Sequence, residues 1–144
     1  RVLDLFCGLG NFTLPMATLA SFVLGIEGSE AMVERGKDNA QRMGLSNLDF
    51  ASVDLTDVTD TKHWVDIGFN KILLDPPRSG AIEVLPAVTA LKPERIVYVS
   101  CNPNTLARDA ACLKELGYQL DAAGVMDMFP QTTHVESIAL FVKA

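Results

Sequence analysis

Short apolar runs alternate along this chain with stretches whose apolar residues recur every three or four positions. Runs of the first kind predict β-strands and stretches of the second kind predict α-helices, so the alternation is typical of an α/β sheet. The predicted strands start at Val2 and then cover residues 21–27, 48–53, 69–74, a run from Ile96 to Cys101, and a last strand that ends at Val142.

Capping residues and prolines mark the helices. Ser29 is a good N-cap for a helix that runs to Met43. Residues 82–91 form a shorter predicted helix in which Pro86 is an irregularity. In the polar segment 55–68 we assign no function, and we expect His63 at the surface and Trp64 partly buried. Helical spacing in the first of these helices predicts a core face made of Met32, Gly36, Ala40 and Met43.

A cysteine stands where one strand gives way to a helix. The run from Ile96 ends at Cys101, Asn102 is a good N-cap, and Pro103 suits the first helical position. Backbone N–H groups and the helix dipole favour a thiolate at such a place, which makes Cys101 a candidate nucleophile. The alternative is a half-buried loop cysteine without chemistry.

The first predicted strand leads into a loop that contains Gly8 and Gly10. These glycines let the backbone approach a ligand closely, although a tight turn between strand and helix explains them as well. Asp4 precedes the loop, where a carboxylate suits a cationic ligand better than a phosphate. Glu27 ends the next strand at about the ~20-residue spacing of an acid that binds ribose hydroxyls. Its alternative is an exposed acid at a strand end.

Acidic residues also follow the third and fourth strands. Asp54 is either a ligand of an adenine amine or a turn residue. Asp75 opens the stretch Asp-Pro-Pro-Arg-Ser-Gly, whose prolines stiffen the backbone where a sheet meets its ligand cleft. A simple turn needs neither the acid nor Arg78, so we predict a functional role for both.

Glu136 belongs to the last predicted strand. Alternate residues of a strand point the same way, so His134 and Glu136 should share a face that continues as Ile138 and Leu140. A carboxylate beside apolar surface is a candidate acid or base. The alternative is an ordinary glutamate of an edge strand.

Composition restricts the possible functions. The 144 residues suit one domain, and no apolar run approaches the ~20 residues of a membrane span. A net charge of −6 argues against a nucleic-acid binder that acts without another domain. The three cysteines lack the spacing of zinc ligands, and we expect no bound metal. Because we also expect no signal peptide, they favour a reducing compartment and a cytoplasmic protein.

Four stretches together resemble the catalytic domain of the RNA uracil-5-methyltransferases, which methylate uridine in transfer and ribosomal RNA. They are residues 4–14, 75–80, 97–105 and 127–136, and the resemblance covers essentially the whole chain in order. The chain is most similar to the bacterial 23S ribosomal RNA enzymes of this family. The resemblance implies a Rossmann-like class I methyltransferase fold, with a mostly parallel seven-stranded sheet and an antiparallel last strand.

The resemblance also implies a cofactor and a set of site residues. The cofactor is S-adenosylmethionine, bound at its ribose by Glu27 and at its adenine by Asp54. Cys101 would add to carbon 6 of uracil and Glu136 would remove the proton from carbon 5, while Asp75 would hydrogen-bond the uracil edge. The residues expected to line the cofactor site are Asp4, Phe6, Gly8, Gly10, Glu27, Asp54 and Asp75.

Two other functions stay open at this point. The Asp-Pro-Pro stretch also resembles amino-methyltransferases that act on purines, and a cofactor-binding or RNA-binding module without catalysis is a third possibility. The family further implies an upstream RNA-binding β-barrel domain, often with iron–sulfur cysteines. We therefore expect residues 1–144 to be the C-terminal catalytic domain of a longer protein. RNA, rRNA rather than tRNA, would bind mainly through the upstream domain.

Overall fold

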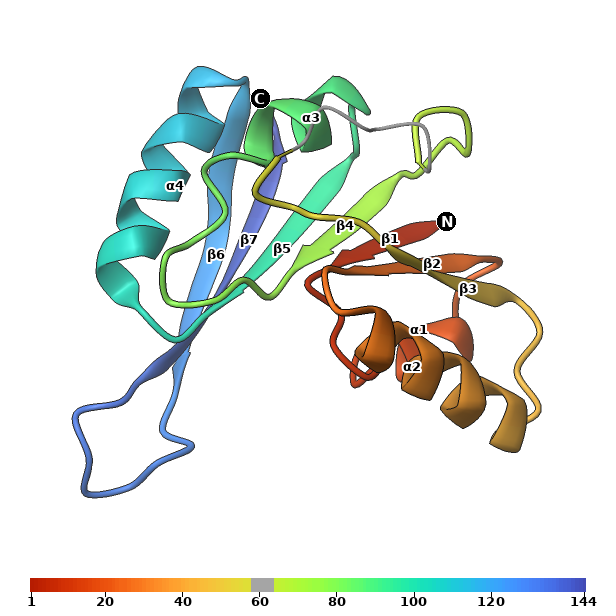
Figure 1. Ribbon diagram of the computed structural model, residues 1–144. Helices are drawn as coiled ribbons and strands as arrows, with labels where there is room; N and C mark the ends of the chain where they lie inside the picture. Colours follow the sequence, from red (N-terminus) through yellow and green to blue (C-terminus); the bar gives the residue numbers. More distant parts are fainter. Residues whose placement is uncertain (58–63) are drawn as a thin grey trace.

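A computed structural model of the chain describes residues 1–57 and 64–144 (Figure 1). The described part contains one seven-stranded sheet and four helices. The strands are β1 (Val2–Leu5), β2 (Val23–Glu27), β3 (Leu48–Ser52), β4 (Lys71–Leu74), β5 (Arg95–Ser100), β6 (Tyr118–Met126) and β7 (Glu136–Lys143). The helices are α1 (Thr13–Ala17), α2 (Glu30–Arg42), α3 (Leu85–Ala90) and α4 (Pro103–Glu115).

The order of the strands is β3-β2-β1-β4-β5-β7-β6. Strands β1 to β5 pair in parallel, and β7 is antiparallel to both of its neighbours. This confirms the predicted mostly parallel sheet with an antiparallel last strand. The order reverses between β1 and β4, and a parallel sheet binds its ligands at the carboxyl ends of the strands beside such a point.

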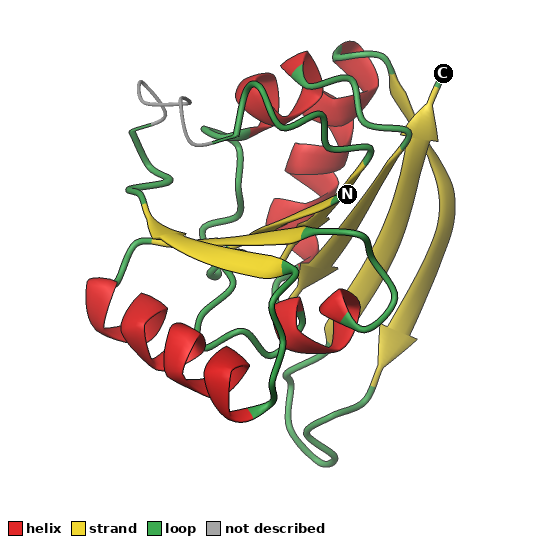
Figure 2. Cartoon of the chain, turned by 90° about the vertical axis from the view of Figure 1, so that its right-hand side faces the viewer, coloured by secondary structure: helices red, strands yellow, loops and turns green. Residues whose placement is uncertain are grey.

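Helices cover both faces of the twisted sheet (Figure 2). On one face, α3 and α4 enclose a core with Leu85 and Leu113, both fully buried. On the other face, Leu14 of α1 and Val33 of α2 form a second core cluster with Phe50 of β3. The central strands are therefore buried on both sides, which explains why they read as nearly continuous apolar runs.

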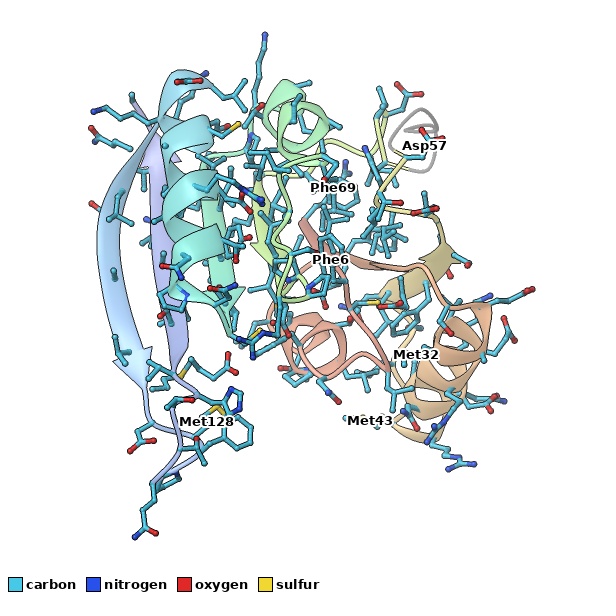
Figure 3. The ribbon with its side chains drawn as sticks, turned by 60° about the vertical axis from the view of Figure 1, so that its left-hand side comes forward. Phe6, Met32, Met43, Asp57, Phe69 and Met128 are labelled. Carbon is cyan, nitrogen blue, oxygen red and sulfur yellow. The ribbon has the colours of Figure 1, made fainter. Side chains whose placement is uncertain are left out.

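The predicted core face of α2 is partly wrong. Its buried residues are Val33, Gly36 and Ala40, whereas Met32 and Met43 lie on the outside of the helix (Figure 3) and are 43% and 57% exposed. The cause is a contact from another element: a Cβ on Gly36 would meet the Phe50 ring at 2.9 Å. That close approach holds the Gly36 side of the helix against the sheet, and Val33, in place of Met32 and Met43, completes the buried face.

Two smaller predictions also change. Trp64 is fully buried in the core at 1% exposure, not partly buried. Pro86 lies in the first turn of α3, where its missing N–H has no helical partner to lose, so it begins the helix instead of disturbing it. His63 lies outside the described residues. No helix in residues 1–57 and 64–144 is both long enough and apolar enough to span a membrane.

Candidate active site

A cavity of about 480 Å³ opens at the edge of the sheet where β4 and β5 end and β7 begins. Two carboxylic acids, Asp75 and Glu136, face it from neighbouring parts of that edge, and the rest of its wall is apolar. The cavity is lined by Phe12, Asp75, Val99, Met126, Met128, Phe129, Glu136 and Ile138. An apolar pocket with a few convergent polar groups is the usual form of a small-ligand site.

The environment of Asp75 in this cavity alters its acidity. Asp75 follows β4 and donates its backbone N–H to the Leu5 carbonyl at 3.3 Å, which ties it to the end of β1. Burial raises the pKa of Asp75, and the nearby Glu136 carboxylate raises it further. The Asp75 carboxyl therefore keeps a proton to higher pH than an ordinary aspartate and can donate a hydrogen bond to a ligand oxygen.

Cys101 lies on the turn between β5 and α4, two residues after Val99 of the cavity wall. Its neighbour Ser100 pairs with Ser137 of the antiparallel strand β7, so Cys101 and Glu136 stand opposite each other just beyond that pair. The turn is braced because the Ser100 hydroxyl accepts from the Asn102 N–H at 3.0 Å. Asn102 caps α4 by accepting from the Asn104 N–H, as predicted. The cysteine is half-buried and does not form part of the cavity wall.

The other two cysteines have surroundings that suppress thiolate chemistry. Burial, followed by the charges of Asp4 and Glu27, raises the pKa of the Cys7 thiol to about 12. Burial also raises the pKa of Cys112, on α4. A thiol acts as a nucleophile in its ionised form. Cys101, at the carboxyl edge of the sheet, is therefore the cysteine whose place suits a nucleophile.

The glycine loop after β1 takes an unusual backbone path. Phe6, Gly8 and Gly10 all have positive φ, at 63°, 55° and 89°. Among the described residues, a Cβ on Gly8 would have nothing within 4 Å, so there is open space beside it; ligand binding there stays a prediction. A Cβ on Gly10 would lie 2.8 Å from the Phe50 ring, so this glycine is required for packing, and its place in the cofactor site stays a prediction.

Asp4 lies beneath this loop and does not line it. The residue is completely buried, and its Oδ2 accepts a hydrogen bond of 2.6 Å from the Thr13 hydroxyl at the start of α1. Its Oδ1 is buried and has no hydrogen-bond partner among the described residues. Burial, opposed by the Thr13 hydrogen bond and assisted by the charge of Asp75, raises the pKa of Asp4 to about 7. Asp4 therefore stabilises the loop through its bond to Thr13 and does not make the direct contact with a ligand that we expected.

Glu27, the last residue of β2, joins the glycine loop to the segment that leads into α2. Its two carboxylate oxygens accept from the Gly8 N–H and from the Ser29 N–H, each at 3.1 Å. Ser29 occupies the N-cap position of α2, but its side chain makes no capping bond. Glu27 remains partly accessible, so its carboxylate is held in place at the carboxyl edge, as a ribose ligand requires.

Asp54 acts as a turn residue in the structure. Its Oδ1 accepts from both the Thr56 N–H at 2.8 Å and the Thr56 hydroxyl at 2.7 Å, and these bonds lower its pKa. The residue is exposed just after β3, next to the end of β2 that carries Glu27. Its turn role does not conflict with adenine binding, which stays a prediction.

His134 does not belong to the last strand. Strand β7 begins at Glu136, and His134 lies in the preceding loop between β6 and β7. Its Nδ1 is 3.4 Å from a guanidinium nitrogen of Arg78, and its ring packs edge-on against Phe129. The predicted common face of His134 and Glu136 is therefore wrong, whereas the apolar neighbourhood of Glu136 is confirmed by Ile138 and Val99 in the same cavity.

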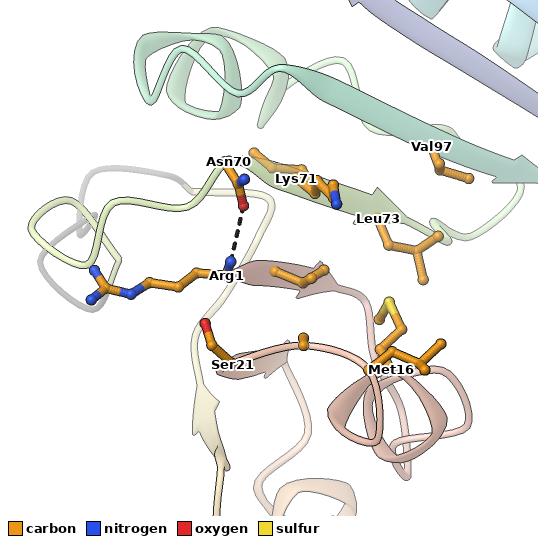
Figure 4. A pocket seen from close by; sticks show the side chains of 11 residues that line it. Arg1, Met16, Ser21, Asn70, Lys71, Leu73 and Val97 are labelled. Atoms are coloured by element: carbon orange, nitrogen blue, oxygen red, sulfur yellow. Dashed lines mark hydrogen bonds between the residues drawn. The ribbon is translucent and has the colours of Figure 1, made fainter.

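A second hollow lies at the opposite edge of the sheet. It holds about 370 Å³ and is lined by Arg1, Met16, Lys71, Leu73 and Val97, among others (Figure 4). It sits beside the amino ends of β1 and β4, whereas ligands of such sheets bind at the carboxyl ends. None of the predicted site residues lines it. The described part of the chain contains no cluster of three or more side chains suited to hold a metal ion.

Comparison with known proteins identifies the family. A family model described as tRNA (Uracil-5-)-methyltransferase matches residues 1–144. The chain belongs to this family.

Its relatives include bacterial enzymes of ribosomal RNA. The 23S rRNA (uracil(1939)-C(5))-methyltransferase RlmD of Alkalilimnicola ehrlichii is 64% identical over 142 residues, which make up 98% of this chain and 32% of that protein. The RlmD of Legionella pneumophila strain Corby is 57% identical over 143 residues, or 99% of this chain and 32% of the relative. The chain thus spans about a third of the length of these proteins.

Solved structures agree on the fold. The tRNA (uracil-54, C5)-methyltransferase of Pyrococcus abyssi, in complex with S-adenosyl-L-homocysteine, matches 99% of this chain and 34% of its own, with 34% identity and a TM-score of 0.84. TrmN from Thermus thermophilus matches 100% of this chain and 44% of its own, with 25% identity and a TM-score of 0.80. The protein has the predicted Rossmann-like class I methyltransferase fold.

Proposed function

We propose that this chain is the catalytic domain of an enzyme that transfers a methyl group from S-adenosylmethionine to carbon 5 of a uridine in RNA. The observation that carries the proposal is the cavity that holds Asp75 and Glu136 next to the Cys101 turn. A nucleophile, an acid whose pKa is raised by burial, and a second carboxylate beside apolar walls are groups that suit this reaction.

The residues at the ends of β1 to β3 fit the proposed cofactor. Gly8 leaves its backbone open, and Glu27 holds a carboxylate at the edge of the sheet for the ribose hydroxyls. Asp54 would take the adenine amine. The Oδ1 of Asp4, which has no partner in residues 1–57 and 64–144, places partial negative charge under the loop and so favours a cationic ligand above it. S-adenosylmethionine, when bound there, supplies an electrophilic methyl group on a sulfonium, and the sulfur leaves with the electron pair as a neutral thioether.

Cys101 makes carbon 5 of uracil reactive. Its sulfur forms a bond to carbon 6, and the electron pair of the carbon 5–carbon 6 double bond moves to the carbonyl oxygen at carbon 4. The resulting enolate makes carbon 5 nucleophilic, so that it can take the methyl group. A protonated Asp75 can donate a hydrogen bond to the uracil edge.

Glu136 completes the reaction by removing the proton that remains on carbon 5. The carbon–hydrogen electron pair restores the double bond to carbon 6, and the cysteine sulfur leaves as a thiolate. Glu136 stands opposite Cys101 across the β5–β7 pair, and it lines the same cavity as Asp75. The target base must leave its stack to enter such a pocket.

The substrate we propose is 23S rRNA. The family model carries a tRNA description, but relatives at 57–64% identity are named as 23S rRNA enzymes, whereas the tRNA enzyme of known structure is 34% identical. The chain carries a net charge of −6, and these relatives are about three times as long. We therefore propose that RNA binds mainly through a further domain, and that the enzyme works in the cytoplasm.

Tritium at carbon 5 of uridine tests the proposed reaction. Full-length protein, unlabelled S-adenosylmethionine and RNA carrying 5-tritiated uridine should release tritium into water as 5-methyluridine appears, and Cys101→Ala should abolish both. Methylated purine without tritium release would support the amino-methyltransferase alternative. Cofactor binding without any methyl transfer would support a non-catalytic module. Mapping of 5-methyluridine in RNA from cells that lack the intact gene would identify the modified nucleotide.

A further inference from the structure

A buried carboxylate on α4 binds two distant parts of the chain and a neighbouring arginine on its own helix. Asp109 is completely buried. Its Oδ2 accepts from the Tyr98 hydroxyl at 2.6 Å and from the Ala81 N–H at 2.7 Å. Its Oδ1 accepts from Nε and Nη2 of Arg108, at 2.8 and 2.7 Å. A buried carboxylate with all these charge-assisted or short hydrogen bonds holds its partners in a defined geometry.

The partners of Asp109 belong to the elements that carry the candidate active site. Tyr98 lies on β5, three residues before Cys101, and Ala81 follows the segment that begins at Asp75. Arg108 extends the contact, because its Nη2 also donates to the Ser79 carbonyl at 2.8 Å. The network therefore joins the strand that leads to the cysteine, the helix that follows it, and the segment that carries Asp75.

Further contacts hold the same segment. The side chains of Asn102 and Thr105 both donate to the Arg78 carbonyl, at 3.1 and 3.2 Å. Gly80 has a φ of +84°, and a Cβ there would lie 2.6 Å from both the Arg108 guanidinium and the Asp109 carboxylate. The backbone of residues 78–81 is thus seated directly on α4, with no room for a side chain at its closest point.

We infer that Asp109 is a positioning residue: by fixing residues 78–81 on α4, it sets where Asp75 and Arg78 stand relative to Cys101. The inference rests on the proposed function. Asp109 does not line the cavity, so it acts through the segment and not on the substrate. Among the described residues, the hydrogen bonds of the cofactor loop join Gly8 to Glu27 and Asp4 to Thr13 and do not involve Asp109, so we assign Asp109 to the uracil side of the site.

Two variants of the full-length protein test this role. Asp109→Asn keeps the shape of the side chain and removes its charge, and Tyr98→Phe removes a single hydrogen bond. Glu115→Gln removes an exposed carboxylate from the same helix and is the matched control. We expect the single-turnover rate of methyl transfer to uridine to fall about tenfold to a hundredfold in Asp109→Asn and less in Tyr98→Phe, because small displacements of reacting groups cost that much. Affinity for S-adenosylmethionine, measured by calorimetry, should stay within about twofold.

Hydrogen exchange provides a readout that does not depend on the reaction. The amides of residues 78–81 should exchange faster in Asp109→Asn, while those of residues 7–14 should not change. Wild-type rates in both variants would overturn the inference, as would a parallel loss of rate and cofactor affinity, which signals general damage. If Asp109→Asn does not fold, Tyr98→Phe decides on the same measurements. If the wild-type enzyme does not methylate uridine, the proposed function is refuted. Hydrogen exchange still tests the positioning role in that case, because unchanged exchange at residues 78–81 in Asp109→Asn would overturn it.

Discussion

The buried Asp4 should make the stability of the protein depend on pH. Burial raises the pKa of this carboxyl from 3.8 to about 7. At a pH between these two values, Asp4 is protonated in the folded state and ionised in the unfolded state. Each pKa unit corresponds to about 1.4 kcal/mol, and the ionised form therefore costs about 4 kcal/mol of folding free energy above pH 7. Because the acid pKa is raised, the cost is absent below pH 4 and grows as pH rises towards 7.

Asp4→Asn removes the charge and with it this dependence. Part of the cost is already present at pH 5, so the stability of the variant relative to wild type should improve by about 3 kcal/mol between pH 5 and pH 8. Any constant loss from a weaker bond to Thr13 cancels in that difference. Urea denaturation at both pH values measures it, and Asp38→Asn, an exposed carboxylate on α2, serves as the control. A relative stability of Asp4→Asn that does not change with pH would refute the reasoning.

Three further predictions concern the cofactor half of the site and the RNA. Glu27→Gln should weaken binding of S-adenosylmethionine by about 1–3 kcal/mol in calorimetry, whereas Glu30→Gln, an exposed neighbour on α2, should not; equal affinities would remove Glu27 from the site. Gly10→Ala should destabilise the protein by about 2–4 kcal/mol because of its positive φ and the clash with Phe50, and Gly8→Ala should cost only about 1 kcal/mol in thermal or urea unfolding. Residues 1–144 alone should bind RNA weakly, whereas the full-length protein should bind tightly and with a steep salt dependence; filter binding that gives equal affinities would contradict this.

Local signals in the sequence predicted where several candidate site residues lie in the fold. The turn at Cys101 was predictable because an apolar run, an N-cap asparagine and a first-turn proline follow one another, and each acts within a few residues. Glu27 and Asp75 were found in the same way, as acids directly after apolar runs. The parallel strands β1 to β5 then bring such strand ends to one edge of the sheet, because these strands point the same way.

Contacts between distant segments escaped prediction. The rotation of α2 and the role of Gly10 both depend on the ring of Phe50, which nothing near those positions reveals. Asp4 looked like a ligand, but its burial depends on how α1 folds back over it. The one local sign of the Asp109 network was its helical spacing from Leu113, a core residue of α4. That spacing places Asp109 on the buried face of the helix, where a carboxylate requires hydrogen-bond partners.

A trapped covalent complex tests the central claim most directly. Glu136→Gln keeps the shape of the side chain and loses its basicity, so the methylated uracil should remain bonded to Cys101 because the carbon 5 proton has no acceptor. In the full-length enzyme with S-adenosylmethionine and RNA, we expect this variant to accumulate a protein–RNA adduct that survives denaturing electrophoresis. The double variant with Cys101→Ala should form none. Normal turnover of Glu136→Gln without an adduct, or an adduct that persists in the double variant, would contradict the mechanism.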